Sequence, residues 1–259
     1  MGVVCAKLGD NKKSKELFLN SLDLNIQHEP IVYYNLIEFY FSLNDKDNAI
    51  KIINEALKHH SHNPLILSYL GRYYFENNEY DRAKEVFYDA IKNGSQELMT
   101  YLYLSTLECD VYENPTEDLI SILKDGLSKY PNSGALINNY AYCQILAGNL
   151  AEAQTLLNKF ETTENVFLNA TIGLLKIREG LIDEGRRLYN KAAMIAKNDK
   201  NLFAKVNQKK YLELAKYFLQ SGKTKEAIRL LQKGLKFKAK EKYFENRLKL
   251  LLNEWRESA

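Results

Sequence analysis

The chain has 259 residues, of which 46% are hydrophobic and 27% are charged, and its formal net charge is +3 at pH 7. This composition excludes an intrinsically disordered chain, and the length is sufficient to bury a substantial core. Only four Pro and twelve Gly occur in the sequence, and these are the residues that most often end helices. An all-α fold is therefore predicted.

The cysteines and the hydrophobic segments exclude further classes of protein. Cys5, Cys109 and Cys143 lie far apart and show no C-x-x-C spacing, so neither a disulfide framework nor a zinc site is indicated. There is no leader with a small-residue cleavage site, and no apolar run reaches the roughly eighteen residues of a membrane span. A cytoplasmic protein is expected.

Seven predicted turns divide the sequence into repeat units. Each turn has a Gly or Asn, followed five residues later by a residue that is usually small. Gly and Asn tolerate the left-handed conformation that ends many helices, so each turn joins the two helices of one unit. Successive turns are 35, 34, 36, 34, 32 and 42 residues apart. The pairs are Gly9 with Ser14, Asn44 with Ala49, Asn78 with Ala83, Asn114 with Leu119, Gly148 with Ala153, Gly180 with Gly185 and Gly222 with Ala227.

The first unit begins in the middle of its first helix, because Met1 and Gly2 occupy the positions that Leu70 and Gly71 occupy in the third unit. We expect the chain to be a piece of a longer protein or a shortened open reading frame. Its N-terminal edge is then expected to fray or to pack against another chain, which would allow self-association. The start resembles that of a myristoylated protein, but Ala6 stands where that pattern requires Ser or Thr.

Histidines follow the second unit at His59, His60 and His62, and His28 lies at the neighbouring turn in the repeat pattern. Histidine tracts can bind metal, but no Cys or carboxylate accompanies these residues at the spacing of a zinc site. A solvated loop between units explains them as well. No metal site is therefore predicted.

The third unit, Pro64–Glu97, has the clearest pattern. Its small residues let two helices approach closely, and its aromatic residues fill the space beside those contacts. The spacing resembles the tetratricopeptide (TPR) helix-turn-helix repeat. The resemblance covers nearly the whole chain and implies an all-α, right-handed α-α superhelix, the TPR solenoid. The residues that carry it are Leu67, Leu70, Gly71, Tyr74, Ala83, Phe87 and Ala90.

The later units depart from this pattern in two places. In the fourth unit, the acidic stretch 108–113 lengthens the turn, and Asn114-Pro115 is predicted to start the second helix, because Pro suits the first helical position. The helix that leads to Gly222 is predicted to begin near Lys200 and to be about two turns longer than its counterparts. A bend in the superhelix is expected there.

The C-terminal segment Lys240–Arg256 keeps helical spacing, with an apolar face and a charged face. We expect a capping helix, since an open solenoid leaves the apolar face of its last repeat bare. Residues 1–239 are accordingly predicted to form the solenoid and residues 240–259 the cap. The apolar positions are Tyr243, Phe244, Leu248, Leu251, Leu252 and Trp255.

Charge is unevenly distributed along the chain. Residues 1–199 hold 20 Lys and Arg against 27 Asp and Glu, a balance of −7, whereas residues 200–259 hold 16 against 6, a balance of +10. A basic end suggests contact with phosphate or with an acidic surface. Because the basic residues are mainly lysines without interleaved aromatics, the favoured interpretation is that they are solvated faces of the last helices.

TPR proteins usually bind partners along a concave groove lined by the first helix of each unit. The family's clamp for a C-terminal carboxylate is not reproduced, and the apolar positions suit a peptide or an amphipathic helix. Arg72 and Tyr142 are expected to contribute most to binding, and substitution of either is expected to leave folding almost unchanged. The predicted groove residues are Tyr34, Glu38, Phe41, Ser68, Arg72, Phe75, Leu102, Asn138, Tyr142 and Ile145.

The sequence contains no phosphate loop, no nucleophile elbow and no catalytic grouping that the repeat pattern does not already explain. It therefore predicts a non-enzymatic protein-binding scaffold without a cofactor, whose partner is a protein or peptide rather than nucleic acid or a membrane. Two alternatives stay open. One is a regulatory or sensor arm of a larger protein. The other is an RNA-binding helical repeat, because residues 33–37 resemble the opening of a pentatricopeptide repeat, although the acidic body would repel phosphate.

Overall fold

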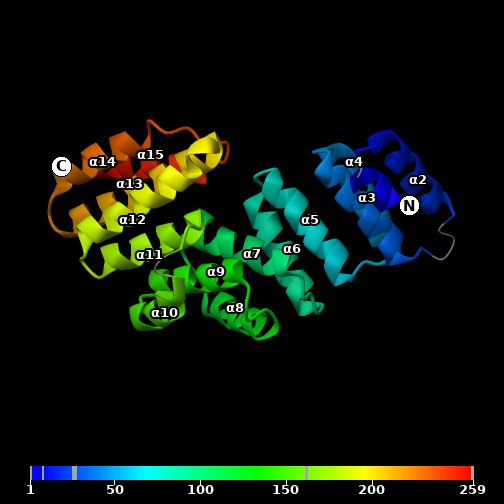
Figure 1. Cartoon of the computed structure of the whole chain (residues 1–259), viewed down its shortest axis with the longest axis horizontal. Helices are drawn as coiled ribbons and strands as arrows, with labels where there is room; N and C mark the ends of the chain where they lie inside the picture. Colours follow the sequence, from blue (N-terminus) through cyan, green and yellow to red (C-terminus); the bar gives the residue numbers. More distant parts are fainter. Residues whose placement is uncertain (1, 8, 25–27, 161–162, 258–259) are drawn as a thin grey trace. The chain divides into compact units, whose positions relative to one another are not determined.

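The computed structural model describes residues 2–7, 9–24, 28–160 and 163–257, and every regular element within these ranges is a helix (Figure 1). The chain forms two compact units, Met1–Leu104 and Ser105–Ala259, which we call the N-terminal block and the C-terminal block. No helix in the described ranges combines the length and the apolar character needed to cross a bilayer. The all-α prediction is confirmed.

The N-terminal block consists of helix pairs joined by short turns. Asp10, Asp45 and Asn63 cap the helices that follow them, because their side chains accept hydrogen bonds from backbone N–H groups of the first turn. Pro30 and Pro64 occupy first helical positions, where no N–H partner is needed. The helices are α1 (Gly2–Lys7), α2 (Asn11–Asp23), α3 (Pro30–Ser42), α4 (Lys46–His59), α5 (Pro64–Glu76), α6 (Tyr80–Lys92) and the first part of α7 (Leu98–Thr106).

The C-terminal block continues the pattern after a π-helical segment, Leu107–Val111, that directly follows α7. Short 3-10 turns extend two of its helices at 158–160 and 196–198. The helices are α8 (Glu117–Lys129), α9 (Gly134–Leu146), α10 (Leu150–Leu157), α11 (Val166–Arg178), α12 (Ile182–Ile195), α13 (Lys200–Gln220), α14 (Thr224–Gly234) and α15 (Tyr243–Glu257).

Six of the seven predicted turns have the expected left-handed residue, with φ between 56° and 86° at Gly9, Asn44, Asn78, Gly148, Gly180 and Gly222. The fourth turn differs, because its left-handed residue is Glu113, with φ 54°, rather than Asn114. A side chain other than Gly or Asn is disfavoured in this conformation. The fourth turn is therefore the strained one.

The start of α8 also differs from the prediction. The helix begins at Glu117, and its N-cap is Thr116, whose hydroxyl accepts a hydrogen bond from the Leu119 N–H at 3.1 Å. Thr116 is itself held by the Glu108 carboxylate, which accepts from its N–H and its hydroxyl at 2.8 Å. Pro115 therefore precedes the helix, because a capping threonine outweighs the preference of proline for a first helical position.

The predicted close helix contacts are present. A Cβ at Gly71 would lie 2.6 Å from the ring of Phe87, which is fully buried. A Cβ at Gly173 would lie 3.0 Å from the backbone oxygen of Gly185, and the converse distance is 2.7 Å. These pairs of helices approach so closely that only glycine fits without displacement of a neighbour.

The long helix and the apolar C-terminal face are confirmed as well. Helix α13 has 21 residues and starts at Lys200, where the side chain of Asp199 caps it. Helix α15 packs against α13, α14 and the π-helical segment, and therefore belongs to the C-terminal block. Its buried residues are Tyr243, Phe244, Leu248, Leu251 and Leu252.

Candidate functional site

Arg72 is the centre of a surface formed by α3, α5 and the first part of α7 in the N-terminal block. Its Nε donates to Glu76 Oε1 at 2.8 Å, and its Nη1 lies 3.5 Å from Glu38 Oε1. The guanidinium also lies over the Phe41 ring, 4.0 Å from the ring centroid. The Arg72 side chain is 21% exposed and that of Glu38 is 54% exposed, so part of this ion pair faces solvent.

Aromatic side chains surround Arg72. The Phe75 and Tyr103 rings meet edge to face with centroids 4.8 Å apart, and the Tyr34 hydroxyl donates to Asn63 Oδ1 at 2.9 Å. Burial raises the pKa of Tyr69 and Tyr103 above the usual tyrosine value, and for Tyr103 this effect outweighs the opposing charge of Arg72. These hydroxyls therefore stay protonated and can act as hydrogen-bond donors. We call the following set the Arg72 surface, in which Glu38 is exposed and the others are partly exposed: Tyr34, Glu38, Arg72, Phe75 and Tyr103.

Two predicted groove residues lie beneath this surface instead of on it. Phe41 is buried under the Arg72 guanidinium. Ser68 is fully buried, and its hydroxyl lies 2.7 Å from that of Thr100 and 3.2 Å from that of Ser95. Leu102 is partly exposed on α7. The prediction that Phe41 and Ser68 are accessible is wrong, because repeat position alone does not tell which side of a tilted helix is covered by its neighbour.

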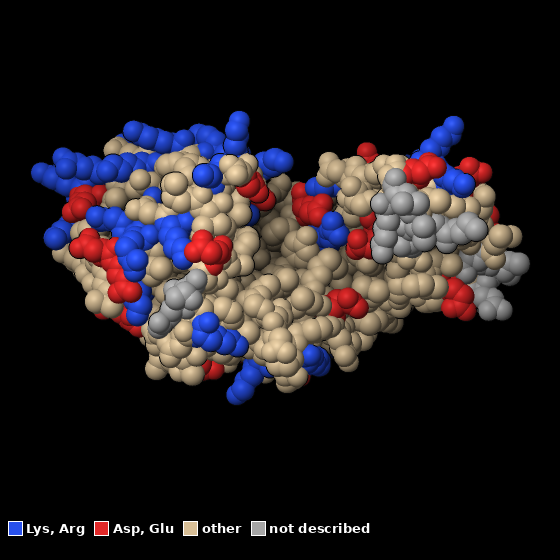
Figure 2. Space-filling view, viewed as in Figure 1, with Lys and Arg blue, Asp and Glu red and all other residues tan. Residues whose placement is uncertain are grey.

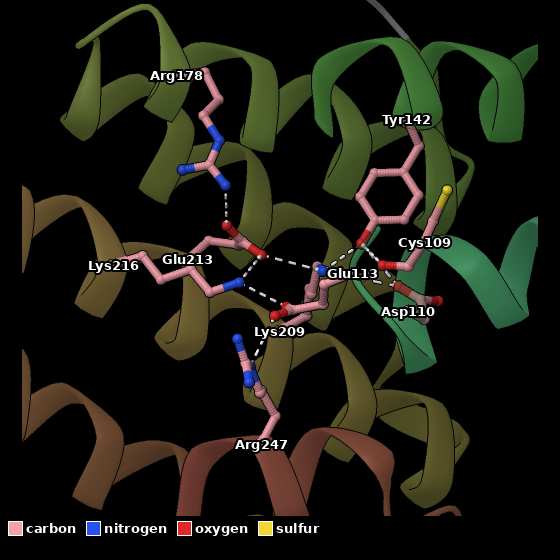
Figure 3. A network of polar contacts seen from close by, with 9 residues as sticks. All are labelled: Cys109, Asp110, Glu113, Tyr142, Arg178, Lys209, Glu213, Lys216 and Arg247. Carbon is pink, nitrogen blue, oxygen red and sulfur yellow. Dashed lines mark hydrogen bonds and ion pairs between the residues drawn. The ribbon is translucent and has the colours of Figure 1, made fainter. Parts of the chain in front are cut away.

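The predicted groove residues of α9 are also inaccessible for the most part. Asn138 and Ile145 are buried, and Tyr142 is partly buried. The Tyr142 hydroxyl donates to Asp110 Oδ1 at 2.8 Å, and Lys209 Nζ donates to the same hydroxyl. Tyr142 therefore belongs to a polar network inside the C-terminal block (Figure 3).

The network centres on Glu213 of α13, which is fully buried. Its carboxylate lies 2.7 Å from Arg178 Nη2, 3.1 Å from Lys209 Nζ and 3.7 Å from Lys216 Nζ. Burial alone would raise the pKa of Glu213, but the charges of Lys209, Lys216 and Arg178 outweigh it and hold the pKa at about 2. Glu213 is thus ionised at neutral pH.

Glu113 forms the second centre. Its Oε1 accepts from Lys216 Nζ at 2.6 Å, and its Oε2 accepts from Arg247 Nε of α15 at 2.9 Å. Lys209 completes the arrangement, because its Nζ lies 4.8 Å from the centroid of the Tyr142 ring and 5.2 Å from that of the Phe244 ring. The network thereby joins the π-helical segment and its turn to α9, α11, α13 and α15.

The charged groups of this network pair with one another inside the C-terminal block. Each of its charged groups has an opposite charge within 4 Å, and Glu213 and Lys209 are nearly inaccessible to solvent. Removing one partner of such a buried group leaves an uncompensated charge. Tyr142 and Arg72 both have specific partners within the chain, so we now expect Tyr142→Ala and Arg72→Glu to cost stability.

The sequence does not predict this network, because the residues that pair in it are distant in the chain. Arg178 and Glu213 are 35 residues apart, and Lys216 and Glu113 are 103 apart. The one local signal is the spacing of Lys209, Glu213 and Lys216, which places three charges on one face of α13.

The histidine side chains near the end of α4 contact one another and a tyrosine. Within the described ranges, no group of three or more His, Cys, Asp or Glu side chains is arranged to hold a metal ion. The His28 ring stacks on that of His59 with centroids 3.5 Å apart, and His28 Nδ1 lies 3.0 Å from the Tyr33 hydroxyl. These residues join the end of α4 to the segment before α3.

Comparisons with known proteins agree with this fold. A family model for the tetratricopeptide repeat matches residues 40–97. The chain is similar to the solved structure of YrrB, described as a TPR protein with an unusual peptide-binding site, at 18% identity and a TM-score of 0.56, over 70% of this chain and 93% of YrrB.

Two further structures show the same likeness. A TPR protein from Parabacteroides merdae has 18% identity and a TM-score of 0.54, and the match covers 84% of this chain and 98% of that one. The Cut9–Hcn1 hetero-tetramer of the APC/C has 13% identity and a TM-score of 0.59, over 94% of this chain and 46% of the matched chain. No curated protein sequence matches the chain. At these identities the likeness is one of fold.

Proposed function

We propose that this chain, part of which matches the tetratricopeptide-repeat model, acts as a non-catalytic scaffold and that the Arg72 surface binds a peptide or a helix of a partner protein. The observation that carries the proposal is the position of Arg72, whose guanidinium lies over the buried Phe41 ring and interacts with the partly exposed Tyr103 of the next first helix. Arg and Tyr are the residue types that most often dominate protein-protein binding energies.

The ion pairs of Arg72 support a role in recognition. Glu76 holds the guanidinium at 2.8 Å, whereas Glu38 lies at 3.5 Å and is largely exposed. An exposed ion pair at this distance contributes little to stability, so a partner carboxylate can replace Glu38 at small cost. The rings around it offer apolar area with hydroxyl donors at its edge, which suits a mixed polar and apolar peptide.

The comparisons support the same class of function. YrrB is described as having a peptide-binding site, and the match to it rests on the shared fold. TPR folds are generally protein-binding modules and are typically not enzymes. The partner of this chain is accordingly proposed to be a protein, contacted by a surface that the first helices build.

A site-specific crosslinking experiment tests this proposal. A photoreactive benzoylphenylalanine at position 38 is expected to crosslink a partner in the native cell, whereas the same residue at position 85 is not. Glu38 and Glu85 are both exposed glutamates of the N-terminal block, but Glu85 lies on α6, outside the Arg72 surface. The partner should be identified by mass spectrometry.

Purified partner then permits a quantitative comparison. Glu38→Arg should weaken or strengthen binding by roughly 1 kcal/mol or more through its effect on Arg72, whereas Glu85→Arg should leave binding unchanged. Equal crosslinking at both positions, or unchanged affinity in both variants, would rule out the Arg72 surface as the binding site.

A further inference from the structure

Helix α14 has a row of basic side chains on its outer face. Lys225, Arg229, Lys233 and Lys236 are spaced by four, four and three residues, which places them along one side of the helix and the turn that follows it. All four are exposed. The opposite side of α14 carries its buried residues, Ala227, Leu230, Leu231 and Gly234. Figure 2 shows basic side chains gathered over this part of the molecule, and we call these four residues the cationic row.

Ion pairs to the cationic row are absent among the described residues. Within the described part of the chain, none of its four side chains has a carboxylate within ion-pair distance. Other surface helices do pair their cations locally, as Lys58 does with Glu55 and Lys129 with Asp125. Like charges at i and i+4 destabilise a helix, and Lys225 stands in the first turn, where the helix dipole disfavours a cation. The arrangement is therefore unfavourable for α14 on its own.

Lysines near the cationic row in the sequence pair with a carboxylate of the chain itself. The Glu245 carboxylate of α15 is contacted by Lys249 at 2.9 Å, Lys238 at 3.1 Å and Lys242 at 3.2 Å. The three lysine side chains are 57%, 62% and 56% exposed, whereas that of Glu245 is 8% exposed. Three exposed lysines thus contact one buried carboxylate of the same chain. Among the residues that the structure describes, none supplies such a carboxylate to the cationic row.

We propose that the cationic row docks an acidic helical segment of a partner protein, with Asp or Glu at about every fourth residue. Such a helix repeats its carboxylates at the spacing of the row, so that each cation meets one carboxylate when the two helices lie side by side. This surface lies in the C-terminal block and is independent of the Arg72 surface.

The row is less suited to nucleic acid or to a lipid surface. Single-stranded nucleic acid is held by exposed aromatic rings, and residues 221–257 expose none, because Tyr243 and Phe244 are buried and Phe237 and Trp255 are partly covered. Peripheral membrane helices insert large apolar side chains beside their cations, and α14 exposes none. Lysines outnumber arginine three to one in the row, which disfavours bidentate phosphate recognition.

Fluorescence anisotropy tests the proposal with a labelled, alanine-rich helical peptide that carries glutamate at every fourth position, and with the same peptide carrying glutamine. Three proteins are compared: wild type, a row variant with Lys225→Gln, Arg229→Gln, Lys233→Gln and Lys236→Gln, and a control with Lys12→Gln, Lys13→Gln, Lys92→Gln and Lys124→Gln. The control residues are exposed, and both variants lose the same charge. Circular dichroism checks that all three are folded.

The wild type and the control should bind the glutamate peptide in a salt-dependent manner, and the row variant should bind it roughly tenfold or more weakly, as expected when several exposed ion pairs are lost. Equal binding by the two variants would show that net charge alone attracts the peptide and would overturn the proposal. Equal binding of the glutamate and glutamine peptides would do the same. Tighter row-dependent binding of oligouridylate, or of phosphatidylserine vesicles, would reassign the surface and refute an acidic helix as its partner.

Discussion

Glu113 and Arg247 lie 134 residues apart in the chain, and Arg247 Nε donates to Glu113 Oε2 at 2.9 Å. The same carboxylate accepts from Lys216 at 2.6 Å. Glu113 therefore ties α15 and α13 to the turn before α8, although its own backbone is in the left-handed region, with φ 54°. A disfavoured backbone conformation persists where surrounding contacts determine it, and the two ion pairs are such contacts.

Substitution of Glu113 should therefore destabilise the C-terminal block. Glu113→Gln is expected to reduce the free energy of unfolding by roughly 1–3 kcal/mol, because Lys216 and Arg247 lose their shared carboxylate. Trp255, the single tryptophan, lies on α15, so urea unfolding followed by its fluorescence reports on this helix. The control Glu117→Gln, at an exposed position, should change stability by about 0.5 kcal/mol or less. Equal effects of the two substitutions would contradict the role given to Glu113.

Glu213 should make stability depend on acid pH. Its pKa is about 2 in the folded protein against 4.5 for the unperturbed group. A lowered folded-state pKa stabilises the protein above pH 4.5, and this contribution, about 3 kcal/mol, is lost as the pH falls from 4.5 towards 2. Glu245, whose pKa its three lysines also lower to about 2, loses its contribution in the same range.

The comparison with Glu213→Gln isolates this contribution. The variant should be less stable than wild type at pH 7, because Lys209 and Arg178 lose a buried partner. Its stability should fall less steeply between pH 4.5 and 2, and the remaining slope should diminish further when Glu245→Gln is added. Urea unfolding at a series of pH values measures both slopes. Parallel curves for wild type and Glu213→Gln would show that the pKa of Glu213 is not lowered in the folded state.

Gly71→Ala should destabilise the N-terminal block. The added methyl group would lie 2.6 Å from the buried Phe87 ring, so α5 and α6 must separate or the ring must move, at a cost of roughly 1–3 kcal/mol. Gly134→Ala is a matched control, since no atom lies within 4 Å of its Cβ position on α9. This control should be neutral or stabilise by up to about 1 kcal/mol. Thermal unfolding of both variants checks the contrast, and equal melting temperatures would show that the α5–α6 contact is loose.

Arg72→Glu should cost stability as well as binding. The new carboxylate would lie among those of Glu38 and Glu76, and the guanidinium contact with the Phe41 ring would be lost. We expect a loss of roughly 1–2 kcal/mol in the free energy of unfolding. Adding Glu76→Arg exchanges the two charges on α5 and should recover part of the loss, because the i,i+4 pair is restored. A double variant no more stable than Arg72→Glu alone would show that the pair does not contribute.

The helix-turn-helix repeat could be predicted from the sequence alone. Six of its seven predicted turns have the expected left-handed residue, and the small residues at Gly71, Gly173 and Gly185 lie at close helix contacts. The length of α13 and the buried side of α15 were also predicted correctly. These features depend on residues close together in the chain, because capping, helical periodicity and left-handed turns are local properties of the backbone.

Only the tertiary structure decided which first-helix residues are accessible and which are enclosed. Ser68 and Asn138 occupy groove positions in the repeat pattern, but both are buried. The network around Glu213 requires side chains from several helices, separated by up to 134 residues, to meet in one place. That meeting depends on how each helix is tilted against the next and on where α15 packs, which no local pattern encodes. The physical reason is that ion pairs between distant residues, unlike turns, form only after the repeats have stacked.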